Sequence, residues 1–360
     1  MKIKSKDIEY AYTHLKFDEG ENAFILSDGQ EHELLFSTDL HLDTEYDPNN
    51  FKLYYYYNKN CSENSIFQVY IKSDENKEIR IGWIFPISSL LSDQHDEAQN
   101  KYFQKYAYVA LYNILNELDI VSNEIYSNII YEALSSDDRI IFVMDKENIV
   151  NIVNFEISDY QIGFYKYGFY ESDKGIRNSN FDKPRKKLHL KKFSNALIDK
   201  NSKLIILSIL EQITSCSSEI LVFYFCYQII EFLINKVFDN EFTTVVKKVT
   251  DSVENLFDIK DEFNDLMNEK KRVRKLFNDY SNINSNSRNS LNELCKDLLR
   301  DNEHRNYNDL GDNIYAVRCL LVHKLYSIQN IEQELVDIDY RFFECIIEIL
   351  ETFKLNTDYK

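Results

Sequence analysis

The chain has 360 residues, of which 44% are hydrophobic and 28% are charged. This composition excludes an intrinsically disordered chain, because disorder goes with low hydrophobicity, and the length favours two domains. The formal net charge is −18, from 42 Lys and Arg against 60 Asp and Glu. That balance excludes a broadly basic surface that coats nucleic acid, although it leaves room for a local basic site.

Cysteine usage and hydropathy indicate the compartment. The six cysteines are scattered, with no CxxC pair and no two of them close to a histidine at zinc-ligand spacing, which is typical of core residues in a reducing environment. The first 22 residues lack the apolar centre of a signal peptide. The most apolar stretch, 220–227, is followed by Gln228 and Glu231, far short of the roughly 20 apolar residues of a membrane span. We therefore expect a soluble, cytoplasmic protein without membrane contact.

The first half of the chain has the periodicity of strands. Residues 22–27 and 32–37 flank Asp28-Gly29, a dipeptide that favours a hairpin turn. Further elements follow in chain order: strands at 51–57, 65–72 and 78–85, helices at about 97–118 and 122–134, and strands again at 139–144, 148–157 and 161–170. The pattern predicts an α+β domain over residues 1–195, which we expect to act as a sensor or a partner-binding module.

The second half has helical periodicity. Residues 174–192 are polar and basic, and beyond about residue 200 the apolar residues recur at helical spacing as far as Phe277. Residues 281–290, SNINSNSRNS, predict a polar loop, and two further helices are expected at roughly 312–326 and 332–353. We therefore expect an all-α bundle over residues 196–360.

Several familiar catalytic motifs are absent from the sequence. It contains no GxxxxGK[ST], GxGxxG, HExxH or GxSxG. A metal-dependent nuclease of the restriction type would need an acidic residue followed by acid-x-Lys on the next strand, and Asp145 has no such partner. The sequence therefore predicts neither a metal site nor a cofactor.

One segment, DNIYAVRCLLVHK at 312–324, carries residues suited to catalysis. On a helix with about 100° per residue, one apolar stripe faces the core and consists of Ile314, Val317, Leu321 and Leu325. Arg318 falls at the edge of this stripe, where a permanent charge requires a partner. His323 points to another face, which it shares with Tyr315 and Cys319. Arg318 and His323 can therefore act together only if this helix packs against a second protein surface.

A partner for Arg318 lies upstream. The segment 223–234 is an apolar helix interrupted by Gln228 and Glu231. Because a carboxylate in such a helix requires a hydrogen-bonded cation, we expect Glu231 to pair with Arg318 and to orient it. The alternative is that Glu231 reaches solvent at a helix end.

An all-α C-terminal bundle that carries Arg-x4-His in IYAVRCLLVHK resembles the HEPN superfamily, and more closely its Apea-like branch. Further similar segments are YQIIEFL at 227–233 and EKKRVRKLF at 269–277, so the resemblance covers about 200–355. The N-terminal half resembles no family. The resemblance implies metal-independent endoribonuclease activity at a cleft between two protomers, in bacterial antiphage defence or as a toxin. Arg318 would stabilise the charge of the transition state, and His323 would transfer a proton during attack by the ribose 2′-OH.

The sequence departs from the family pattern directly after Arg318. Active members usually carry a polar residue there, and this chain has Cys319. Cys319 favours two other interpretations: a non-catalytic bundle that dimerises or binds nucleotides or RNA, and a regulatory subunit that silences a partner enzyme. The intact Arg/His spacing and Glu231 favour cleavage. The mechanism implies a homodimer with a two-fold contact across the helix at 312–326.

Two basic clusters are candidates for RNA contacts. The first lies within 183–192 and includes Lys186 and Lys187, and the second lies on the predicted helix at 269–277 and includes Lys270, Lys271, Arg272, Arg274 and Lys275. The alternative for both clusters is a solvated charged face.

Overall fold

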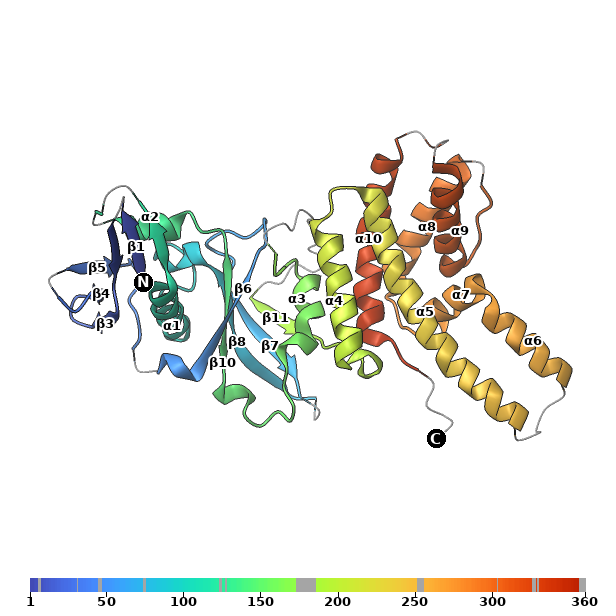
Figure 1. The fold of residues 1–360 in the computed structure, drawn as a ribbon, viewed down its shortest axis with the longest axis horizontal. Helices are drawn as coiled ribbons and strands as arrows, with labels where there is room; N and C mark the ends of the chain where they lie inside the picture. Colours follow the sequence, from blue (N-terminus) through green and yellow to red (C-terminus); the bar gives the residue numbers. More distant parts are fainter. Residues whose placement is uncertain are drawn as a thin grey trace. The chain divides into compact units, whose positions relative to one another are not determined.

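The computed structural model describes residues 1–5, 8–30, 32–44, 47–73, 76–122, 125–126, 128–172, 186–250, 256–302, 304–325, 328 and 330–355. The chain divides into two compact units (Figure 1). The first contains Met1–Phe155, Phe169–Asp173 and Lys183–Leu190, and the second contains Glu156–Gly168, Lys174–Asp182 and Lys191–Lys360. The main boundary thus lies close to the expected residue 195, but the segment 156–168 belongs to the helical unit.

The sheets of the first unit are mostly antiparallel. A five-stranded sheet has the order β11 (Lys187–Leu190), β7 (Phe67–Lys72), β8 (Glu78–Pro86), β10 (Ile140–Asp145) and β6 (Phe51–Tyr56). Two three-stranded sheets have the orders β2 (Ile8–Ala11), β1 (Lys2–Ser5), β9 (Asp119–Val121), and β3 (His14–Asp18), β4 (Ala23–Ser27), β5 (Glu33–Ser37). The expected hairpin around Asp28-Gly29 is confirmed as β4 and β5.

The core of this unit lies between the large sheet and α1 (Lys101–Glu117). Trp83 of β8 packs against Phe103 and Tyr106 of α1, with ring centres 6.0 and 6.1 Å away. At Gly82, beside Trp83, a Cβ atom would overlap the backbone of β10. Aromatic residues therefore fill the space between helix and sheet, and a glycine lets β8 and β10 approach closely. A short helix, α2 (Ile129–Ser135), occupies part of the expected 122–134.

Two predicted strands are wrong. Residues 148–157 form turns and a short 3-10 segment, and residues 161–170 contain the short helix α3 (Gln161–Lys166). The run at 161–165 is buried on all sides and so carries no periodicity that separates strand from helix, whereas no residue of 148–157 is buried. The chain leaves α3 at Gly168, whose φ of 78° suits glycine. Lys203 of α4 (Lys200–Ser215) binds Glu156 at 2.8 Å and Asp159 at 2.5 Å, so it holds this segment on the helical unit.

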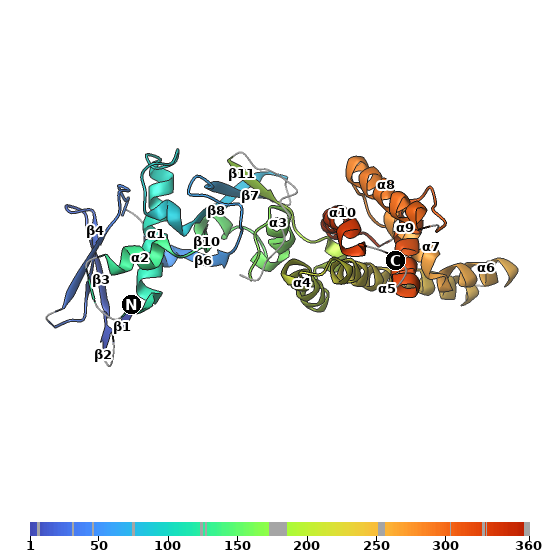
Figure 2. The ribbon, with the colours of Figure 1, turned by 90° about the horizontal axis from the view of Figure 1, so that it is seen from above.

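The second unit consists of helices. After α3 and α4 come α5 (Glu219–Thr250), α6 (Leu256–Met267), α7 (Glu269–Asn278), α8 (Ser285–Asp301), α9 (Leu310–Lys324) and α10 (Ile331–Thr352) (Figures 1 and 2). The two expected C-terminal helices are confirmed within about two residues. The expected polar loop at 281–290 is correct only to Asn284, because Asn284 caps α8 by accepting a hydrogen bond from the backbone N–H of Asn286.

Helix α5 is longer and more apolar than the sequence analysis allowed. By length and composition it could cross a membrane, but half of its most apolar window is buried within the structure. It packs against α4 and α10. Burial of this kind is also found in the core helices of bundles.

Candidate functional site

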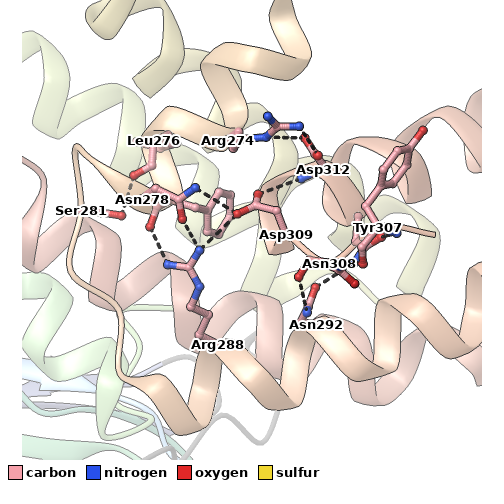
Figure 3. A network of polar contacts seen from close by, with 12 residues as sticks. Arg274, Leu276, Asn278, Ser281, Arg288, Asn292, Tyr307, Asn308, Asp309 and Asp312 are labelled. Atoms are coloured by element: carbon pink, nitrogen blue, oxygen red, sulfur yellow. Dashed lines mark hydrogen bonds and ion pairs between the residues drawn. The ribbon is translucent and has the colours of Figure 1, made fainter.

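The start of α9, the helix that carries Arg318, is fixed by polar contacts to α7 and α8 (Figure 3). Asp309 caps the helix by accepting from the backbone N–H of Asp312 at 3.3 Å. The buried Asp312 receives a two-pronged contact from Arg274, with Nε 3.0 Å from Oδ1. Asn278 donates to Asp309 at 2.9 Å, and Arg288 lies 3.5 Å from the same carboxylate. These contacts set the position of α9 along α7.

The loop before α9 is held from inside. The fully buried Asn313 accepts from the backbone N–H of Tyr307 at 2.7 Å and donates to its carbonyl at 2.7 Å. Its side chain also donates to Asn292 of α8 at 2.8 Å. Gly311 lets α9 approach α7 closely, because an added Cβ would lie 2.8 Å from the Cα of Arg274.

The predicted apolar stripe of α9 is largely confirmed. Ile314, Val317 and Leu321 are buried, whereas Leu325, just beyond the helix, is 37% exposed. Arg318 lies at the edge of the stripe, half-buried and directed towards α5. The helical wheel thus placed the guanidinium correctly and erred only at the last residue of the stripe.

Arg318 lies beside Glu231 of α5, but the two make a loose ion pair and not the expected hydrogen bond. Its Nη2 lies 3.9 Å from Oε1 of Glu231, whose side chain is 44% exposed, so the carboxylate also reaches solvent as the alternative had it. The Cζ of Arg318 lies 5.7 Å from the ring centre of Tyr227. The Tyr227 hydroxyl in turn donates to Glu269, the first residue of α7, at 2.9 Å. Three helices therefore contribute to the surroundings of one guanidinium. We call Tyr227, Glu231, Glu269 and Arg318 the Arg318 cluster.

The pKa values in this cluster are shifted. Burial raises the pKa of Glu231, the charge of Glu269 raises it further, and Arg318 opposes both. Burial and the neighbouring Glu269 also raise the pKa of Tyr227, which keeps its hydroxyl protonated as a donor. Burial disfavours the charged form of Arg318, but Glu269 and Tyr227 more than offset this, and its pKa lies above the ordinary value. The cluster therefore places a cation near two carboxyl groups, of which Glu231 is partly buried.

Tyr315 and Cys319 lie half-buried on α9 beside Arg318. Burial is the main cause of the raised pKa of Tyr315, and Cys319 is the next. Their proximity to each other is thus confirmed. The wheel grouped both with His323, but they lie close to the guanidinium as well.

His323 lies away from the Arg318 cluster. Five residues along a helix turn the side chain by about 140° relative to Arg318, and His323 is exposed at the last turn of α9. Within the described part of the chain it makes no hydrogen bond or ion pair. A single protomer therefore does not bring its Arg318 and His323 together.

Most cations of α7 already have partners within the helical unit. Lys271 pairs with Asp265, Arg274 with Asp312, and Lys275 with Glu241. Lys270 lies 3.9 Å from Asp312, with its Nζ 3.3 Å from the ring centre of Tyr307, and Arg272 lies over the ring of Phe238. RNA contact by this helix stays a prediction, and it would compete with these contacts.

Of the other basic cluster, Lys183 and Arg185 lie outside the described residues. Lys186 and Lys187 belong to the first unit, not to the bundle. Lys186 pairs with Glu97 at 3.1 Å, and Lys187 lies 4.8 Å from the ring centre of Tyr70. Across the described ranges, no group of three or more His, Cys, Asp or Glu side chains is arranged to hold a metal ion.

Comparison with known proteins does not identify the chain: no family model, no curated protein and no solved structure matches it. Tyr227 and Glu269 are neighbours of Arg318 that the sequence does not predict. They lie in the segments YQIIEFL and EKKRVRKLF, and only the packing of α5, α7 and α9 reveals their contact.

Proposed function

We propose that the helical unit is a HEPN-type, metal-independent endoribonuclease that acts as a cytoplasmic homodimer, in antiphage defence or as a toxin. The observation that carries the proposal is Arg318, a permanent cation on the penultimate helix, held by Glu231 and Tyr227 and still 28% exposed. A guanidinium in this position offers a planar fork to phosphate oxygens. The proposal also rests on the resemblance of residues 200–355 to the HEPN superfamily.

A dimer would supply the arrangement that one protomer lacks. Arg318 and His323 diverge on α9, so a two-fold contact across this helix would place the motifs of both protomers along one cleft. Val322 is 46% exposed and Leu325 37% exposed beside His323, and such an interface would bury both. His323, exposed at the cleft, would transfer a proton to or from the ribose 2′-OH or the leaving oxygen.

The second candidate is a non-catalytic bundle that dimerises or binds nucleotides or RNA. Two observations favour it: Cys319 follows Arg318, and Glu231 and Glu269 surround the guanidinium with negative charge. A phosphate would have to displace Glu231 or bind beside it. The two candidates therefore predict different behaviour for Glu231→Gln. In the first, Glu231 orients Arg318, so the variant should lower the cleavage rate even where RNA affinity rises; in the second, it should only raise RNA affinity.

The decisive experiment is RNA cleavage by the full chain in EDTA. We expect Arg318→Ala and His323→Ala each to lower the rate by about 100-fold or more. Arg300→Ala, an exposed arginine of α8, and His41→Ala, an exposed histidine of the first unit, are the matched controls and should retain activity. A fully active double variant would remove these residues from the mechanism. No cleavage by the wild-type chain would favour the binding candidate.

The dimer is tested separately by sedimentation. We expect Val322→Glu to shift the chain to monomer, whereas Val246→Glu, at a similarly exposed valine of α5, should leave the dimer intact. A dimer that persists in Val322→Glu would place the interface away from the end of α9.

A further inference from the structure

The edge of the large sheet in the first unit exposes a row of aromatic and basic side chains. Strand β11 pairs with β7, and β7 pairs with β8 (Figure 2). Side chains alternate between the two faces of a strand, and one face is buried through Val69, Ile71, Leu188 and Leu190. The opposite face carries Lys187, His189, Tyr70, Lys72 and Arg80.

The rings of this face are stacked and paired with cations. Tyr70 and His189 are direct neighbours in the register, with ring centres 5.6 Å apart and planes 23° apart. The Nζ of Lys187 lies 4.8 Å from the Tyr70 ring centre. Arg80 is the register partner of Tyr70 on β8, and its Cζ lies 5.1 Å from the ring centre of Tyr102 at the start of α1. A continuous row thus runs from His189 through Tyr70 and Arg80 to Tyr102.

The charge of this surface contrasts with that of the whole chain. Among the described residues of this surface, the cations are Lys72, Arg80, Lys101, Lys186 and Lys187, and the carboxylates are Glu78, Asp96 and Glu97. Lys186 pairs with Glu97 at 3.1 Å, and Nδ1 of His189 lies 3.5 Å from Glu78. Cations thus outnumber carboxylates among these described groups, although the chain carries −18. The side chain of Tyr102 is 60% exposed, so the face of its ring that Arg80 does not cover is open to solvent.

We propose that this surface, made by β11, β7, β8 and the start of α1, binds single-stranded nucleic acid. Bases stack on the rings of His189 and Tyr102, and the backbone phosphates lie against Lys187, Arg80 and Lys72. Stacking requires unpaired bases, so the surface discriminates against duplexes. This binding does not depend on cleavage by the helical unit.

The test is fluorescence anisotropy with the full chain and a labelled ten-residue oligo(dT), which lacks the 2′-OH and cannot be cleaved through it. We expect Tyr102→Ala to weaken binding by about 5- to 100-fold. Tyr102→Phe keeps the ring and should bind like the wild type. Tyr131→Ala removes a similarly exposed tyrosine, 46% exposed on α2, and should have no effect.

Salt dependence tests the phosphate contacts. We expect Lys187→Ala to reduce the slope of log K against log salt by about 0.7, whereas Lys16→Ala, an exposed lysine of β3, keeps the slope. Oligo(U) on a His323→Ala background shows whether RNA is preferred over DNA.

Three results would overturn the proposal. They are no binding by the wild-type chain, unchanged binding by Tyr102→Ala, and equal affinity for a duplex of the same length. Weak binding by Tyr102→Phe in a chain that melts like the wild type would also remove the ring from the site.

Discussion

The substitution Gly311→Ala separates what helix propensity predicts from what the packing of α9 predicts. Alanine is the better helix former by about 0.5–1 kcal/mol, so propensity alone predicts a more stable helical unit. In the structure, however, the new Cβ would lie 2.8 Å from the Cα of Arg274, 3.0 Å from its N and 3.1 Å from the carbonyl oxygen of Val273. All three neighbours are backbone atoms of α7 and cannot rotate away.

The magnitude follows from these two effects. Overpacking costs about 1–3 kcal/mol, and three backbone atoms within 3.1 Å of the new Cβ put this site in the upper part of that range, about 2–3 kcal/mol. After subtraction of the helix gain of about 0.5–1 kcal/mol, the helical unit should lose about 1–2.5 kcal/mol of its free energy of unfolding. For a unit of this size, each kcal/mol lowers Tm by about 2–4 °C. We therefore expect a decrease in Tm of about 2–10 °C.

The two units can be followed separately in one sample. The single tryptophan, Trp83, is buried in the first unit, so its fluorescence reports that unit, whereas ellipticity at 222 nm is dominated by the helices of the second. The ellipticity transition should shift and the fluorescence transition should not. Asn289→Ala on the exposed face of α8 is the propensity control and should be neutral or stabilising. An unchanged or higher Tm for Gly311→Ala would refute the close approach of α9 to α7.

Three further predictions use the same readouts. Lys203→Ala leaves the buried Asp159 without its cation and should lower the free energy of unfolding of the helical unit by about 3 kcal/mol. Lys200→Ala, at an exposed lysine one turn earlier, should lower it by less than about 0.5 kcal/mol. Equal effects of the two substitutions would contradict the buried pair. Burial raises the folded-state pKa of Glu231 above 4.5, so the folded chain binds more protons than the unfolded chain between pH 4.5 and the raised value. The stability of the wild type therefore falls as the pH rises through that window, and in urea melts Glu231→Gln should gain stability relative to the wild type from pH 4 to pH 7. A stability difference that does not change with pH would argue against the shift. Gly82→Ala should lower the temperature of the tryptophan fluorescence transition and leave the ellipticity transition unchanged, the reverse of Gly311→Ala, because the new Cβ would overlap the backbone of β10. A fluorescence transition at the wild-type temperature would contradict that packing.

The elements with clear periodicity could be predicted from the sequence. The aromatic strands β6, β7, β8 and β10 and the two C-terminal helices agree with the expected ranges within a few residues. Helix α8 was missed because its first turn is rich in Asn and Ser, which favour caps and turns as much as loops. Helix α3 was mistaken for a strand because its short apolar run is buried on all sides. The local sequence shows neither the capping of α8 by Asn284 nor the burial of α3.

Only part of the candidate site could be predicted from the sequence, because some of its contacts depend on how the helices pack. The pair of Arg318 with Glu231 followed from the cost of charge near a core, which depends on residue type and helical phase. Glu269 could not be found this way, because it is the first residue of α7 and its contact with the cluster, a hydrogen bond from the hydroxyl of Tyr227, depends on how α7 packs against α5. Contacts across three helices depend on how the bundle packs, and the sequence does not show that.

The two basic clusters, on α7 and on β11, look similar in the sequence but differ in the groups that their cations contact. On α7, Lys271, Arg274 and Lys275 each face a carboxylate, so their charge is largely neutralised within the bundle. On the β11 edge, Lys187 lies over the ring of Tyr70 and is exposed to solvent, where a phosphate can reach it. A ring polarises towards a cation but does not cancel its charge, so the attraction for an anion persists. The net charge of −18 therefore says little about where nucleic acid binds, and the partner of each cation is the better guide.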